Sequence, residues 1–321
     1  MLSHKKIKIF FQILGPLVFL YILSKIDYQF LFEEIKLLKW HFLILAVGLM
    51  IFKITFKALR WRIILLSLNV SISKISALNL YWSGALTGLA TPGHFGELIK
   101  VYFLKNRGHN VFHSFFSLIL DRIIDILTLL IFGFLIFLFF LKNIGVYVIS
   151  LGLIFLFIII FIFLILDQRT FLHKVFNKLF QRFLPVDFSD YSRFSFSKFF
   201  KGLKDLKKKE VFYFFAYLII GWFFYFLSRY LVALSLGLDL SFMTITAISI
   251  LVAIITALPI SIAGLGTREA AVIYFFSLFG LNKEIAVLFS LLIFTVDILV
   301  ISLGLIFYLR ELSLINKVKQ I

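Results

Sequence analysis

The sequence of 321 residues contains no cysteine, and this absence excludes several kinds of site. Disulfide bonds, zinc or iron–sulfur centres with cysteine ligands, and thiol nucleophiles all require that side chain. The chain also has no P-loop, no dinucleotide fingerprint and no Gly-x-Ser-x-Gly elbow. Of six histidines, only His109 and His113 have helical ligand spacing, and no His-Glu-x-x-His motif accompanies them. We expect no metal, no cofactor and no ATP-driven pumping by this chain alone.

Hydrophobic residues are in large excess. They make up 62% of the chain, and the mean hydropathy is +1.07. Soluble domains contain about 45–50% apolar residues. A soluble core could not bury the surplus, so lipid must cover much of the surface. The expected fold is an all-α polytopic membrane protein.

The net charge of +17 comes from 33 basic and 16 acidic residues. Segment 167–210 alone holds eleven lysines and arginines against five acids. Basic clusters between apolar spans follow from the positive-inside rule, and no zinc-finger or RNP-type pattern accompanies them. The charge therefore indicates membrane orientation, and no nucleic-acid partner is expected.

Bilayer thickness sets the length of a crossing helix at about 20 apolar residues. Two regions, 77–106 and 243–280, are apolar but interrupted by glycine, proline and charge, so each is two short spans or one re-entrant hairpin. Interfacial helices are expected at 28–39 and around 171–180, within the basic stretch. Six full spans are predicted near residues 9–25, 41–59, 112–141, 145–166, 211–236 and 283–309.

The positive charges also predict an orientation. With both broken regions counted as hairpins, a cytoplasmic N-terminus places the basic residues at 57–62, segment 167–210 and the C-terminal tail on the cytoplasmic side. The first span resembles a signal peptide, but no small-residue cleavage site follows, so it is expected to stay uncleaved. We predict a multi-pass protein of the cytoplasmic (inner) membrane with both termini in the cytoplasm.

An internal repeat is present at an offset of 172 residues. Without a gap, Glu97 aligns with Glu269 and Asp125 with Asp297, so both copies have a Glu-to-Asp spacing of 28. Gly108 and Asn110 align with a glycine and an asparagine, which are scarce residues here. Three predicted spans separate the copies, and an odd number inverts the second relative to the first. The predicted organisation is one membrane domain with repeats at about 41–141 and 211–309, joined by the cytoplasmic connection 167–210.

Inverted repeats with Gly/Pro-interrupted segments are typical of secondary transporters, whose substrates bind between the repeats near the midplane. The alternative is a duplication kept for packing, in which glycines permit close helix approach. Charges at membrane depth are costly and usually functional, which favours transport.

In each broken region a Pro/Gly turn leads to an acid and then to an apolar helix. The first turn contains Gly93, Gly96 and Glu97, and the helix that follows presents an N-terminal dipole to which an anionic lipid phosphate could bind. Alternatively, the glutamates complement their own helix dipoles. Arg268 adds a fork of donors that suits phosphate. The corresponding residues of the second turn are Gly264, Gly266, Arg268 and Glu269.

Predicted span 112–141 carries Asp121, Arg122 and Asp125. The two acids are four residues apart, and Arg122 can reach Asp125 at i+3. The group either pins this helix to a hairpin or forms part of a polar path for a head group. Asp297 has no arginine beside it, and Arg268 is the expected partner.

Arg60 and Arg62 follow the second predicted span, with Lys57 and Trp61 nearby. Such a cluster is ordinarily an interfacial anchor. It could also form a landing site for a lipid head group on the cytoplasmic side.

Four motifs occur along the chain: ALRWR at 58–62, TPGHFGELIK at 91–100, DRIID at 121–125 and PISIAGLGTRE at 259–269. Together and in this order they resemble the flippase-like membrane domain of the lysylphosphatidylglycerol synthases, which also exists as stand-alone proteins. The resemblance covers roughly residues 10–310 and implies lipid translocation, but it does not specify the lipid. The helix N-termini and Arg268 favour an anionic or phosphate-containing head group.

Bifunctional members of that family carry a separate synthase domain. No segment after Arg310 is long enough to be an aminoacyl-transferase, so we expect translocation rather than synthesis, with a separate synthase or glycosyltransferase as a partner. A membrane-embedded transferase that uses Glu97 or Asp125 as a base is one alternative, although no nucleophile–base pair is evident. A scaffold for a cell-envelope synthase is another.

Overall fold

The computed structural model describes residues 15–140, 205–257, 261 and 263–319. By its internal contacts the chain divides into two compact units, residues 1–123 with 206–321, and residues 124–205. Predicted span 145–166, predicted helix 171–180 and most of the basic connection lie outside the described residues. The fold is therefore described below for the first unit and for helix α6.

The described part is helical and contains no β-strand, as expected for an all-α membrane protein. A short apolar helix, Gly15–Ser24, comes first. The other elements, in chain order, are α2 (Tyr28–Lys36), α3 (Trp40–Ser67), α4 (Lys74–Leu89), the 3₁₀ helix η1 (Pro92–Leu98), α5 (Ile99–Asn106), α6 (Val111–Phe140), α10 (Lys208–Ser235), α11 (Phe242–Ala257), α12 (Thr267–Ser277), α13 (Lys283–Ser302) and α14 (Gly304–Lys319).

Three stretches of the described chain are long and apolar enough to cross a membrane: Trp40–Ser67, Lys208–Ser235 and Lys283–Leu314. A helix of 28 residues is about 42 Å long, which exceeds the roughly 30 Å hydrocarbon core of a bilayer. Helix α3 contains the predicted span 41–59 and continues beyond it to Ser67. Arg60 and Arg62 therefore lie within the helix rather than beyond it.

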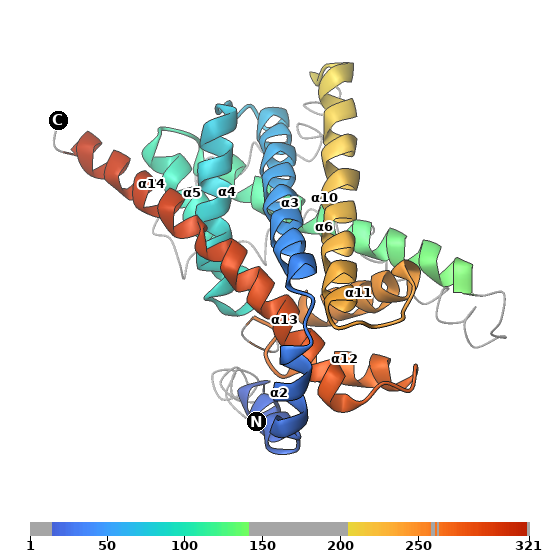
Figure 1. Ribbon diagram of the computed structural model, residues 1–321. Helices are drawn as coiled ribbons and strands as arrows, with labels where there is room; N and C mark the ends of the chain where they lie inside the picture. Colours follow the sequence, from blue (N-terminus) through green and yellow to red (C-terminus); the bar gives the residue numbers. More distant parts are fainter. Residues whose placement is uncertain (1–14, 141–204, 258–260, 262, 320–321) are drawn as a thin grey trace, which may run out of the picture. The chain divides into compact units, whose positions relative to one another are not determined.

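Helices α3 and α10 lie side by side and run in opposite directions (Figure 1). The hydroxyl of Ser228 donates a hydrogen bond to the carbonyl of Ala46 across the contact (3.0 Å). Further along, Gly221 of α10 faces Phe56 of α3. Since 221 precedes 228 while 56 follows 46, these contacts fix the antiparallel sense. Small residues at such a contact permit close approach of the helix backbones.

The elements of the two halves recur at nearly constant offsets. Helices α3 and α10 are each 28 residues long and begin at 40 and 208, while α4 and α11 are each 16 long and begin at 74 and 242. Both offsets are 168. Helices α6 and α13 begin at 111 and 283, an offset of 172. The second half thus carries four additional residues in its hairpin.

Four helices also end in the same manner. Asn69, Gly108, Gly237 and Gly280 follow α3, α5, α10 and α12 with φ between +59° and +79°. In each case the next amide donates to a carbonyl five residues back, as in a Schellman motif: Val70 to Leu65, His109 to Leu104, Leu238 to Ala233 and Leu281 to Phe276. Glycine suits three of these positions because it has no Cβ to oppose a left-handed φ.

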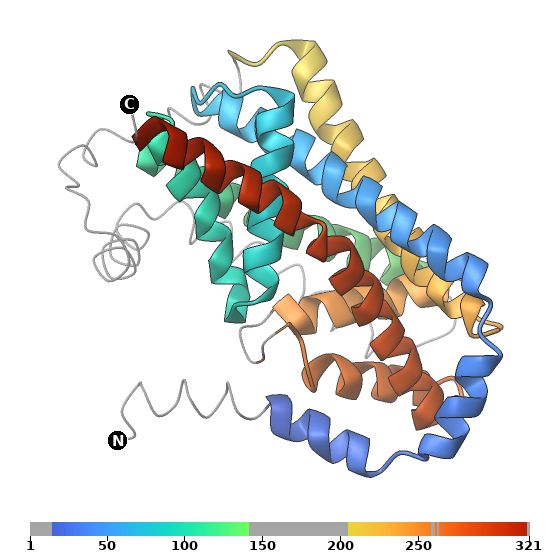
Figure 2. The ribbon, with the colours of Figure 1, turned by 60° about the vertical axis from the view of Figure 1, so that its left-hand side comes forward.

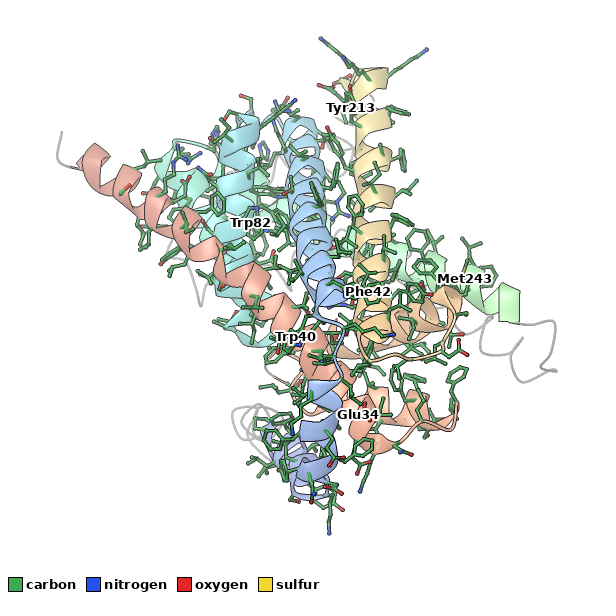
Figure 3. The ribbon with its side chains drawn as sticks, viewed as in Figure 1. Glu34, Trp40, Phe42, Trp82, Tyr213 and Met243 are labelled. Carbon is green, nitrogen blue, oxygen red and sulfur yellow. The ribbon has the colours of Figure 1, made fainter. Side chains whose placement is uncertain are left out.

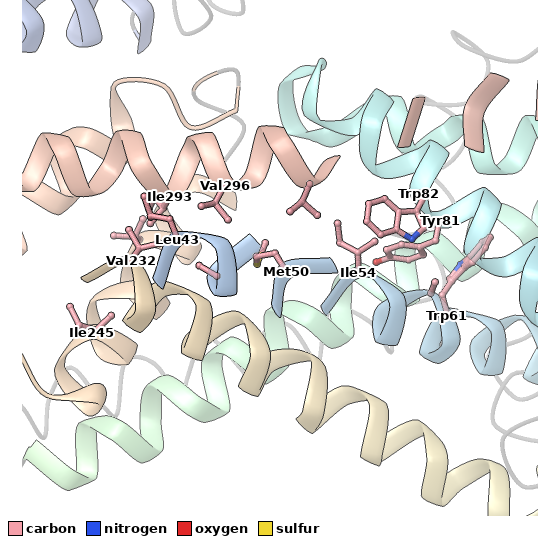
Figure 4. Close-up of a cluster of buried hydrophobic side chains, with 14 of the residues drawn as sticks. Leu43, Met50, Ile54, Trp61, Tyr81, Trp82, Val232, Ile245, Ile293 and Val296 are labelled. Atoms are coloured by element: carbon pink, nitrogen blue, oxygen red, sulfur yellow. The ribbon is translucent and has the colours of Figure 1, made fainter. Parts of the chain in front are cut away.

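The apolar core runs between α3, α4, α10 and α13. Met50 and Ile54 of α3 lie at its centre, with Val232 of α10 and Val296 of α13 also buried there (Figure 4). Helix α14 packs along α4 (Figure 2), where Gly304 approaches the carbonyl of Trp82 and the Trp82 and Phe307 rings stack at 5.6 Å.

Large apolar side chains project from the other faces of the long helices (Figure 3). Ile44 on α3 is 71% exposed, and Phe212 and Ile219 on α10 are 68% and 57% exposed. An apolar surface of this extent is unfavourable in water, whereas it is compatible with contact to lipid.

Candidate functional site

The turn of the first hairpin joins α4 to η1 and is held by threonine side chains. The hydroxyl of Thr87 donates to the carbonyl of Gly96 (2.7 Å), and the amide of Gly96 donates to the hydroxyl of Thr91 (2.6 Å). A Cβ on Gly96 would overlap the Thr87 carbonyl, so the close approach of η1 to α4 requires glycine there. Gly93, the other predicted glycine of this turn, lies within η1.

Glu97, at the end of this turn, contacts two cations. Lys100 Nζ donates to Glu97 Oε2 (2.7 Å), and Arg122 of α6 forms an ion pair with Glu97 Oε1. The Lys100 side chain is buried, and its ammonium lies 4.2 Å from the ring centroid of Tyr81 and 5.1 Å from that of Trp61. Arg122 is 41% exposed. The Glu97 carboxylate thus links the hairpin to α6 through the accessible Arg122, and it also pairs with the buried Lys100 of its own hairpin.

Asp121 lies beside Arg122 on α6 and faces the long helices. Arg60 Nη2 donates to Asp121 Oδ1 (2.5 Å), and the hydroxyl of Tyr81 donates to Oδ2 (3.0 Å). Both partners of the Arg60–Asp121 ion pair are buried. The Arg60 guanidinium therefore lies inside the helix bundle, where Asp121 neutralises it.

Two further predicted residues flank this cluster. Arg62 donates from Nε to the carbonyl of Ile72 (2.7 Å), which holds the α3–α4 loop against the end of α3. Asp125 is buried on α6, one helical turn beyond Asp121, and belongs to the second unit.

The second hairpin turns through Gly264 and Gly266, whose φ angles are +76° and +80°. A Cβ on Gly266 would overlap the carbonyl of Gly15 in the N-terminal helix Gly15–Ser24. A Cβ on Gly15 would in turn lie 2.8 Å from the carbonyl oxygen of Leu265. The tip of this hairpin is therefore filled by another segment of the chain, and glycine on both sides allows the contact.

Glu269 is completely buried at the start of α12. Its Oε2 accepts a hydrogen bond from the amide of Gly266 (2.7 Å), which caps the helix. Its Oε1 accepts from Arg268 Nη2 (2.6 Å) and from the hydroxyl of Ser290 on α13 (2.9 Å). Arg268 Nε also donates to Ser290 (2.9 Å), and the guanidinium lies 4.4 Å from the centroid of the Phe294 ring. These contacts form a closed, buried network.

Asp297 of α13 is paired with Arg229 of α10. Arg229 Nη2 donates to both carboxylate oxygens, at 2.8 and 2.9 Å, and Nη1 donates to the carbonyl of Ile293 (3.3 Å). The prediction that Arg268 is the partner of Asp297 is wrong, because the Arg268 guanidinium is engaged by Glu269 and Ser290. Each half thus has an arginine on its long helix paired with an aspartate on a helix that follows the hairpin.

Four residues of these clusters are not among those predicted from the sequence: Arg229, Lys100, Tyr81 and Ser290. Two of these carried a signal. Arg229 is the single charged residue in predicted span 211–236, and a charge at membrane depth requires a partner. Lys100 lies three residues after Glu97, within reach on a helix. Tyr81 and Ser290 carried none, because uncharged polar residues are common in apolar helices.

Long apolar helices, lipid-compatible outer faces and buried ion pairs define a helical integral membrane protein. The chain matches the lysylphosphatidylglycerol synthase TM region over residues 8–304 and belongs to that family. The comparisons found no match among curated proteins and none among solved structures.

Proposed function

We propose that this protein translocates a membrane lipid with an anionic, phosphate-containing head group across the cytoplasmic membrane, between two inverted halves. The observation that carries the proposal is the presence of an ion-paired hairpin in each half. A membrane lipid context agrees with the family to which the chain belongs. The proposal treats the chain as one membrane domain with repeats at about 41–141 and 211–309, and with both termini in the cytoplasm.

Matched element lengths and the antiparallel contact of α3 with α10 support the inverted arrangement. Helices α4 and α11 have 16 residues each, about 24 Å, which is shorter than the roughly 30 Å hydrocarbon core. Short segments at matching positions of two halves favour re-entrant hairpins with a substrate site between them.

The cost of the charges supports a functional role. Burial of Arg60, Lys100, Asp121 and Glu269 carries a desolvation penalty that an apolar bundle would avoid. In our proposal Arg122 contacts the head group, since it is the accessible cation of the first hairpin, and Glu97 occupies it when no lipid is bound. Arg268 and Glu269 hold the second hairpin in shape. Arg60 with Asp121, and Arg229 with Asp297, fix each long helix to the helix that follows its hairpin.

Reconstitution into liposomes tests the function. A fluorescent phosphatidylglycerol labelled on its head group is distributed over both leaflets, and a membrane-impermeant reductant then bleaches the outer leaflet. We expect the protein to convert the protected inner fraction into an accessible one at a rate well above that of empty liposomes. Equal rates with phosphatidylglycerol, and with lipids extracted from the source membrane, would contradict translocation.

The same vesicles separate translocation from the alternatives. A lipid-modifying transferase would change the mass of the extracted lipid, whereas a translocase leaves it unchanged. A scaffold for a cell-envelope synthase would show neither effect, and cells carrying Glu97→Gln or Arg268→Ala would then function normally.

A further inference from the structure

The two hairpins are alike in sequence but not in accessibility. Glu269 is completely buried with one guanidinium, a serine hydroxyl and a backbone amide, and the tip beside it is filled by Gly15. Glu97, by contrast, is ion-paired with a guanidinium that is 41% exposed. Gly266 of the second turn packs directly on the Gly15 backbone, whereas the first turn carries a cation that a ligand can reach.

The Glu97–Arg122 pair is suited to exchange. Because the Arg122 side chain is 41% exposed, opening this pair costs less than opening a fully buried one. A guanidinium binds the two oxygens of a phosphate in the same forked geometry that it uses for a carboxylate. Glu97 also contacts Lys100, so it keeps a cationic partner at 2.7 Å when Arg122 turns away. The carboxylate therefore does not become a stranded charge when the pair opens.

We propose that an anionic phosphodiester head group binds at the first hairpin by displacing Glu97 from Arg122, and that the second hairpin is a fixed anchor without a ligand. This inference rests on the proposed function and narrows it, because it assigns the substrate class and places recognition in one half. Glu97 acts as an internal competitor that occupies Arg122 in the absence of lipid. Phe95, 54% exposed at the same turn, offers an apolar contact for the lipid chains.

Binding to the detergent-solubilised full chain, measured by native mass spectrometry or calorimetry, tests the exchange. The probes are dihexanoylphosphatidylglycerol and its water-soluble head group glycerophosphoglycerol. We expect Arg122→Gln to raise the Kd for the lipid about tenfold, the loss of one charge-assisted contact. Glu97→Gln should lower the Kd severalfold, because it removes the competitor. Arg122→Lys, which keeps the charge without the fork, should fall between wild type and Arg122→Gln.

Lys105→Gln is the matched control, since it removes one positive charge from the same hairpin at an exposed position outside the cluster. It should leave the Kd unchanged, and all variants are first compared by size-exclusion profile. Tighter binding of the lipid than of glycerophosphoglycerol supports a lipid source for the phosphate, whereas equal Kd values overturn it. An unchanged Kd in Arg122→Gln, or weaker binding in Glu97→Gln, also overturns the exchange.

The outcome is independent of the transport assay. If the lipid binds in an Arg122-dependent manner but the labelled lipid does not cross the bilayer, the proposed binding site is supported and translocation is contradicted. Movement with an unaltered Kd in Arg122→Gln would sustain translocation and contradict the site.

Discussion

Arg229 and Asp297 are joined by two hydrogen bonds from a single guanidinium nitrogen, although 68 residues separate them in sequence. The arginine lies on α10 and the aspartate on α13, so the pair fixes the long helix of the second half to the helix after its hairpin. Arg60 and Asp121 make the corresponding link in the first half. The two links are not at equivalent positions, since Asp121 aligns with Ile293, whose carbonyl Arg229 also contacts.

Substitution Arg229→Met should destabilise the protein by about 3 kcal/mol, because it leaves Asp297 without its partner. The double variant Arg229→Met/Asp297→Leu should recover most of that loss, since no charge remains to be desolvated. Thermal unfolding in detergent measures both. A double variant as unstable as the single one would show that the pair is not a charge-balancing link.

Gly96→Ala should lower stability by about 2 kcal/mol, because the new methyl group would overlap the backbone carbonyl of Thr87, which no rotamer change can relieve. Gly48→Ala on α3 is the matched control, since its Cβ would have no neighbour within 4 Å. Alanine in a helix interior is favoured over glycine by up to about 1 kcal/mol, so the control should unfold at the same temperature or higher. Equal losses at both positions would argue against the close hairpin contact.

Glu97→Gln and Glu269→Gln should both destabilise the protein, each by about 3 kcal/mol, because each leaves a buried cation without its carboxylate. Added phosphatidylglycerol should restore stability to Glu97→Gln only. The lipid supplies a phosphate to the cations of the first hairpin, whereas Arg268 of the second is buried and hydrogen-bonded to Ser290. Melting temperatures with and without the lipid check this, and phosphatidylcholine serves as the comparison. Rescue of Glu269→Gln would contradict the division of roles between the hairpins.

Much of this architecture is readable from the sequence because scarce residues mark it. Glycine, proline and charge interrupt two apolar regions, 77–106 and 243–280, and these interruptions mark both hairpins. Apolar composition placed α10 at 211–236, close to its observed bounds of 208 and 235. The offset of 168 between α3 and α10 went unseen, because apolar residues match everywhere in such a chain and four additional residues shift the register.

The errors have a common physical origin. A cluster of Lys57, Arg60 and Arg62 resembles the end of a span, yet α3 continues to Ser67 and Asp121 of another helix neutralises Arg60. Likewise the sequence favours Arg268 as the partner of Asp297, whereas the structure pairs Asp297 with Arg229, which is remote in sequence. Which buried charged residues form ion pairs depends on which helices pack together, and local sequence patterns do not specify this packing.

The account depends most directly on the opposite orientation of the two halves in the membrane. Because the chain has no cysteine, single-cysteine variants need no prior substitution. Ser71, after α3, and Asp239, after α10, are exposed and occupy corresponding turns of the two halves. Labelling intact cells and inside-out vesicles with a membrane-impermeant maleimide should modify Ser71→Cys from the cytoplasmic side and Asp239→Cys from the outside. Labelling of both from the same side would contradict the inverted arrangement.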